Sequence, residues 1–99
     1  MAAQEVLHVD PATLHLPPSR RDGADFVKLH RQLAKYGTST AGMPLVDVKR
    51  GTDGELMIFD GVTRAARVAK YVPGMLIAVE VTGTLLGPVG DLPMVGEKL

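Results

Sequence analysis

The chain has 99 residues, enough for one domain and too few for two cores. It has no cysteine, which excludes disulfides, thiolate metal sites and every mechanism with a cysteine nucleophile. With 45% hydrophobic residues, 22% charged residues and a net charge of zero, it has the composition of a globular protein and not of one that coats nucleic acid by neutralising phosphates.

The first third of the chain predicts a strand, a stiff segment and a helix. Val6–Val9 is rich in β-forming residues and ends at a turn signal. Residues 14–18 form a proline-stiffened extended segment that leads to two arginines. Asp22 offers a helix cap, and Ala24–Tyr36 has the apolar spacing of an amphipathic helix, which Gly37 ends. The apolar face of this helix consists of Phe26, Leu29, Leu33 and Tyr36.

The middle of the chain predicts a hairpin, a second helix and a further strand. Residues 44–50 and 56–59 are the two strands of the hairpin, and the second is apolar on both faces, which favours a buried central position. Val62–Tyr71 has a helical pattern with a face of small residues, and 75–81 alternates like a strand. The expected fold class is therefore α/β, in the sense of an α+β mixed sheet of about four strands with two main helices.

The last stretch, residues 83–99, is expected to be an irregular C-terminal arm beside a domain of residues 1–82. It is too apolar for a solvated tail and too rich in glycine and proline for a regular element. Leu85, Leu86 and Leu92 should bury apolar surface against this domain or against a second copy, because several leucines left in water would promote aggregation. The second alternative predicts a homodimer formed through the arm.

The junction between the second hairpin strand and the second helix is the best candidate for an anion site. A helix N-terminus presents free N–H groups and the positive end of its dipole. Gly61 allows a ligand to approach the backbone, and Thr63 adds a hydroxyl group. Arg64 has the wrong sign for the dipole unless an anion binds there. Alternatively, Asp60 caps the helix and pairs with Arg64, so that both charges are satisfied locally.

The charge distribution also bears on this site. Residues 20–70 contain ten of the eleven Lys and Arg residues and six of the eleven acids, so this segment carries a net charge of +4 and the rest carries −4. Arg20 and Arg67 belong to this basic centre and could assist the junction in holding an anion. The alternative is that these cations only cover the outer faces of the two helices.

Several motifs together resemble a known family. They are Pro18 with Arg20, Tyr36-Gly37, Pro44-Leu45-Val46 and above all Ile58-Phe59-Asp60-Gly61-Val62-Thr63-Arg64-Ala65-Ala66-Arg67. In this order they resemble the ParB/sulfiredoxin-like superfamily, the "ParB-like nuclease" domain, over roughly residues 6–81. The resemblance implies a phosphate-binding turn, since ParB proteins hold the triphosphate of CTP and sulfiredoxin binds ATP there. Gly61 and Arg64 match the shared positions, whereas Val62 and Thr63 match neither family's middle pair.

These departures narrow the functions that the resemblance implies. Val62 stands where sulfiredoxin has its catalytic cysteine, so sulfiredoxin activity is excluded. Val62 also replaces the usual glutamate or histidine, which puts a hydrolytic step through that side chain in doubt. The chain ends before a helix-turn-helix domain could fit, so we do not expect site-specific DNA clamping.

Three functions follow as expectations. The first is a stand-alone module that binds a nucleotide or another phosphate-bearing ligand, such as a nucleoside triphosphate with Mg²⁺, through Gly61, Thr63, Arg64, Arg67 and Arg20. The second is an enzyme that acts on nucleic acid or nucleotides, a small nuclease, hydrolase or toxin-effector domain, with Asp60 and His15 as catalytic candidates. The third is a protein-interaction domain that keeps the fold without the ligand.

The expected location follows from the first of these functions. No stretch has the roughly 18 apolar residues of a membrane span, and the first ten residues lack a signal-peptide pattern, so we expect a cytoplasmic protein with no membrane partner. As a toxin effector it would instead be secreted, and Met1 would not be the native start. The spacing of the three histidines matches no metal-binding pattern.

Overall fold

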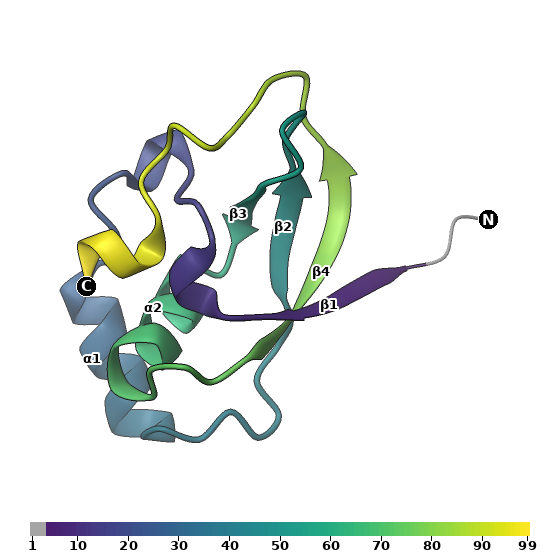
Figure 1. The fold of residues 1–99 in the computed structure, drawn as a ribbon. Helices are drawn as coiled ribbons and strands as arrows, with labels where there is room; N and C mark the ends of the chain where they lie inside the picture. Colours follow the sequence, from purple (N-terminus) through teal and green to yellow (C-terminus); the bar gives the residue numbers. More distant parts are fainter. Residues whose placement is uncertain (1–3) are drawn as a thin grey trace.

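The structure is a computed structural model, and it describes residues 4–99. Met1 and the question of the native start therefore lie outside the described residues. Four strands and two α-helices follow one another along these residues, which confirms the predicted fold class (Figure 1). Their bounds are β1 (Glu5–Val9), α1 (Phe26–Tyr36), β2 (Val46–Arg50), β3 (Leu56–Asp60), α2 (Val62–Tyr71) and β4 (Ile77–Thr84), with short 3-10 helices at Pro11–Thr13, Pro18–Arg20 and Val95–Lys98.

The strands form one mixed sheet in the order β1-β4-β2-β3. β1 pairs with β4 and β2 pairs with β3 in antiparallel fashion, whereas β2 and β4 run parallel. Figure 1 shows both helices on the same side of this sheet. No helix within residues 4–99 is long and apolar enough to cross a membrane.

The core lies between the sheet and α2. The inward side chains of the central strands, such as Val48 and Val79, are fully buried against this helix. The helix meets them with small side chains, including Ala65 and Ala69, which allow its backbone to lie close to the sheet. The small-residue face of the sequence pattern is therefore the buried face of α2, and only Gly61 separates the start of this helix from the end of β3.

The prediction that residues 56–59 form a central strand is wrong, because β3 lies at an edge of the sheet. Phe59 is 62% exposed, and only Met57 and Ile58 are buried. The edge is covered by the proline-stiffened segment: the N–H of His15 donates to Leu56 O over 2.9 Å, and the N–H of Ile58 donates to His15 O over 2.9 Å. The apolar pattern of β3 therefore reflects burial under an irregular segment. The sequence of a strand that is buried in this way looks the same as that of a central strand with a neighbour on each side.

Helix α1 begins later than predicted, at Phe26, and its cap is Asp25 rather than Asp22. The Asp25 carboxylate accepts hydrogen bonds from the N–H groups of Val27 and Lys28. Backbone hydrogen bonds from these two groups lower the pKa of Asp25. Of the predicted apolar face only Leu29 is buried, because α1 packs on α2 and does not reach the sheet core.

The segment 83–99 is more regular than expected. β4 continues to Thr84, past the expected boundary at residue 82, and the segment ends in a short 3-10 helix. Val89 and Val95 are buried, and the N–H of Val95 donates to Leu14 O over 2.9 Å. Leu86 is fully exposed at 104%, so the expectation that it buries against this domain is wrong, and its burial against a second copy stays a prediction. Leu85 and Leu92 are half-buried.

The hairpin turn and the C-terminal arm are joined by Asp53, whose carboxylate accepts from the N–H groups of Gly90 (2.8 Å), Val89 (3.2 Å) and Glu55 (3.2 Å). Partial desolvation raises the pKa of this carboxyl, but these N–H donors lower it more, so it lies below its usual 3.8. The ionised Asp53 carboxylate therefore stabilises the fold fully at a pH above the pKa that this group has in the unfolded protein. The stabilisation is lost as the pH falls through the lower pKa that it has in the folded protein.

We therefore expect Asp53→Asn to lower Tm at pH 7. Below about pH 3.8, the Tm of the variant should fall less steeply than that of wild type, because the amide has no carboxylate charge to lose when the pH falls. Melting curves of both proteins from pH 7 to pH 2.5 would test this. Two profiles that run parallel over the whole range would contradict a stabilising role of the carboxylate.

Candidate anion-binding site

The junction between β3 and α2 has a backbone that only glycine tolerates. Gly61 has φ +117°, in the region that favours glycine. A Cβ atom at this position would lie 2.8 Å from Arg64 Nη2 and 3.2 Å from both γ carbons of Val46. Gly61 is also the N-cap of α2, and no side chain of the described residues caps this helix. The backbone N–H groups in the first turn of α2 therefore have no side-chain cap, and Gly61 next to them has no side chain that would block a ligand.

A cavity of about 220 Å³ lies at this junction, and we call it the turn cavity. Its wall contains charged and polar side chains from three parts of the chain, namely Arg20, Lys28, Gln32, Asp60, Thr63 and Arg64. Arg20 arrives there because residues 14–16 run parallel to β3 and continue toward its end. Three cations and one carboxylate thus surround the positive end of the α2 dipole, which makes the cavity electrostatically suited to an anion.

Arg64 is the most constrained cation of this wall. Its side chain is 21% exposed, and Nη2 donates to Leu45 O over 3.3 Å. The alternative partner, Asp60, does lie nearby, with Oδ2 at 4.0 Å from Nη2. The Asp60 side chain is 78% exposed, however, and a solvated pair at this distance contributes little. Asp60 does not cap α2, so that part of the alternative is wrong.

Arg67 occupies a different environment from the one expected. It is only 2% exposed and does not line the turn cavity. Its Nη1 donates to Gly37 O over 2.9 Å and to Ser39 O over 2.8 Å, and its guanidinium lies 5.6 Å from the centre of the Tyr36 ring. Arg67 therefore holds the segment after α1 in place on α2, a structural task that its position one turn after Arg64 did not reveal.

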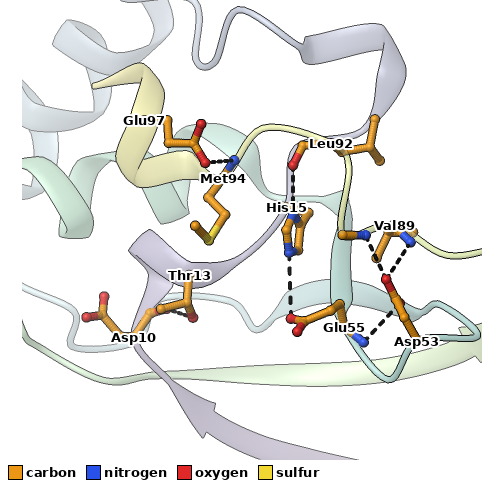
Figure 2. Close-up of polar contacts among 10 residues, drawn as sticks. Asp10, Thr13, His15, Asp53, Glu55, Val89, Leu92, Met94 and Glu97 are labelled. Atoms are coloured by element: carbon orange, nitrogen blue, oxygen red, sulfur yellow. Dashed lines mark hydrogen bonds and ion pairs between the residues drawn. The ribbon is translucent and has the colours of Figure 1, made fainter.

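His15 also lies away from the turn cavity, although the residues after it reach the cavity. It is buried at the start of β3, and its ring connects two other segments (Figure 2). Nδ1 lies 2.8 Å from Leu92 O, which can only accept, so Nδ1 carries a proton and donates. Nε2 lies 3.6 Å from the Glu55 carboxylate. Figure 2 shows His15 between the arm and the hairpin, where it joins these parts of the fold.

The residues of the turn cavity that sequence reasoning missed include two from α1, Lys28 and Gln32. They lie four residues apart and so on one side of α1, and this spacing could have indicated a shared face. Both lie outside the apolar face predicted for this helix, and nothing in the sequence shows that their side of the helix faces the α2 N-terminus. Among residues 4–99, no group of three or more metal-ligating His, Cys, Asp or Glu side chains is present.

The site thus contains four of the five residues expected to bind the ligand, namely Gly61, Thr63, Arg64 and Arg20, together with the catalytic candidate Asp60. Arg67 and His15 lie elsewhere. Comparison with protein-family models, with curated proteins and with solved structures gives no match to this chain.

Proposed function

We propose that this protein is a ParB-like module that binds a nucleotide or another phosphate-bearing ligand, with the phosphate in the turn cavity. The observation that carries the proposal is the position of Arg64, held beside an uncapped helix N-terminus together with Arg20 and Lys28. A cation at this position opposes the helix dipole at a cost of about 0.3–1 kcal/mol. A bound anion reverses that cost, since it interacts favourably with both the dipole and the cations.

The geometry favours a phosphate over a singly charged anion. Three cations and a helix N-terminus can balance more than one negative charge, and a guanidinium offers two parallel donors to a phosphate. Thr63 adds a hydroxyl group that can donate to a further oxygen. The matching Gly61 and Arg64 of the ParB-like resemblance agree with this interpretation, although Val62 departs from the family pattern.

Binding is a better description of the turn cavity than catalysis. Asp60 is the one carboxylate among the described residues that line the cavity, and no histidine lines it. The exposed Asp60 has neither a second acid nor a base beside it in this wall, as acid–base hydrolysis would require. If Mg²⁺ takes part, phosphate oxygens of a triphosphate and water molecules would supply most of its ligands, because this ion usually keeps several waters.

Calorimetric titration tests the proposal. We expect wild type to bind pyrophosphate and at least one of ATP, CTP and GTP, with or without Mg²⁺, and Arg64→Ala to weaken that binding about 10- to 100-fold through loss of a charge-assisted contact. Arg64→Lys should recover only part of it, because lysine cannot make the two-pronged contact. Arg31→Ala is the matched control, since Arg31 is an exposed α1 arginine that does not line the cavity.

The opposite pattern would support the local pair of Asp60 and Arg64. In that case wild type binds no phosphate compound at millimolar concentration, and Arg64→Ala loses a little stability while Arg31→Ala does not. A melting curve of each variant, recorded without ligand, separates an effect on binding from an effect on folding.

A further inference from the structure

A second cavity, of about 150 Å³, adjoins the turn cavity, and we call it the inner cavity. It lies between α1, α2 and the segment after α1, and its wall includes Gln32, Tyr36, Met43, Pro44, Arg64 and Arg67. Gln32 and Arg64 line both cavities, so the two spaces share a wall. Each is smaller than the roughly 300 Å³ at which small-molecule sites begin, whereas together they reach that range.

The inner cavity also gathers all the unpartnered buried polar atoms of the described side chains. Within residues 4–99, the buried side-chain nitrogen and oxygen atoms with no hydrogen-bond partner are Gln32 Oε1, Arg64 Nε and Arg67 Nε. All three side chains line this one cavity, and Arg67 is 2% exposed. Buried polar atoms are nearly always hydrogen-bonded, and each exception is costly. Three buried polar atoms without a partner around one cavity indicate that this cavity holds a polar molecule or group.

The chemistry of the three atoms defines that occupant. An amide oxygen can only accept a hydrogen bond, and a guanidinium Nε–H can only donate one. The occupant must therefore donate to Gln32 and accept from Arg64 or Arg67. A hydroxyl group, of a ligand or of water, does both, whereas a fully ionised phosphate cannot donate and an alkyl group can do neither.

We propose that the inner cavity binds the hydroxyl-bearing part of a phosphate ester, such as a sugar phosphate, whose phosphate lies in the turn cavity. This inference rests on the proposed function and adds the class of ligand. Gln32 is then the residue that determines specificity, because its amide oxygen requires a hydrogen-bond donor next to the phosphate.

Calorimetric titration with three phosphate compounds tests this proposal. Ribose 5-phosphate carries hydroxyl groups, n-butyl phosphate carries only an alkyl group, and inorganic phosphate carries neither. We expect wild type to bind ribose 5-phosphate about tenfold more tightly than the other two, as one or two additional hydrogen bonds provide. Gln32→Met keeps the length of the side chain without its amide, and should lower the affinity for ribose 5-phosphate to that for n-butyl phosphate. His30→Leu, at an exposed α1 position that lines neither cavity, should keep the preference.

Equal binding of all three probes to wild type would overturn the inference and leave the proposed function intact. A Gln32→Met variant that keeps the preference for ribose 5-phosphate would overturn the role of Gln32. If no probe binds, this inference fails, whereas the proposed function is decided by the titration with pyrophosphate and the nucleoside triphosphates. If Gln32→Met does not fold, the comparison of ribose 5-phosphate with n-butyl phosphate on wild type still decides, because these ligands differ mainly in their hydroxyl groups.

Discussion

Replacing Arg67 with alanine is expected to lower the free energy of unfolding by about 3 kcal/mol. The change removes a fully enclosed guanidinium that donates to Gly37 O and Ser39 O and lies over the Tyr36 ring. It strands two carbonyl groups and empties the space between α2 and the segment that follows α1. For a chain of this size the expected Tm is lower by at least about 12 °C.

Lys70→Ala is the matched control for this change, because Lys70 is an exposed cation on the same helix. Its loss should change the free energy of unfolding by no more than about 0.5 kcal/mol. Urea unfolding of both variants measures the difference. Arg67→Ala with the midpoint of wild type would mean that burial of the charge costs as much as its hydrogen bonds contribute, and that this arginine does not hold the segment.

Replacing Gly61 with alanine is expected to lower the free energy of unfolding by about 2–3 kcal/mol and to weaken phosphate binding about 10- to 100-fold, as Arg64→Ala does. A side chain at φ +117° is strained by about 1–3 kcal/mol. The new Cβ would also lie 2.8 Å from Arg64 Nη2, so this guanidinium must move out of its place beside the helix N-terminus. Stability and affinity should therefore fall together.

Gly54→Ala separates the two effects, since Gly54 has φ +81° but open space where a Cβ would stand. It should show the backbone strain alone, about 1 kcal/mol, with unchanged phosphate binding. Urea unfolding and calorimetric titration of both variants give the comparison. If Gly61→Ala and Gly54→Ala lose the same stability and bind phosphate equally well, the contact with Arg64 is not what requires a glycine at residue 61.

Much of the fold could be predicted because local patterns dominate it. The bounds of α2 were predicted correctly, since small residues on one helical face and the Pro73-Gly74 stop signal are local features. The place of β3 could not be predicted in the same way. Its apolar residues are covered by residues 14–16, which have no regular secondary-structure pattern of their own and are joined to β3 by two backbone hydrogen bonds.

The residues of the candidate site also differ in whether local sequence predicts them. The features of the junction itself, Gly61, Thr63 and Arg64, follow from a strand, a glycine and a helix start in sequence. Lys28 and Gln32 depend on how α1 packs against α2, which is a tertiary property that no local pattern encodes. The basic centre predicted that Arg67 assists the junction, but this residue lies one turn after Arg64, under the segment that follows α1, and donates to backbone carbonyl groups there.

The most direct test of the anion site is an NMR titration, in which ¹H–¹⁵N correlation spectra of the ¹⁵N-labelled protein are recorded while pyrophosphate is added. If the phosphate binds at the open end of α2, the backbone signals of Val62, Thr63 and Arg64 should shift most, because their N–H groups point toward the ligand. Smaller shifts are expected at Arg20 and Lys28, which also line the turn cavity. Unchanged signals at residues 62–64 with millimolar pyrophosphate present would contradict the account.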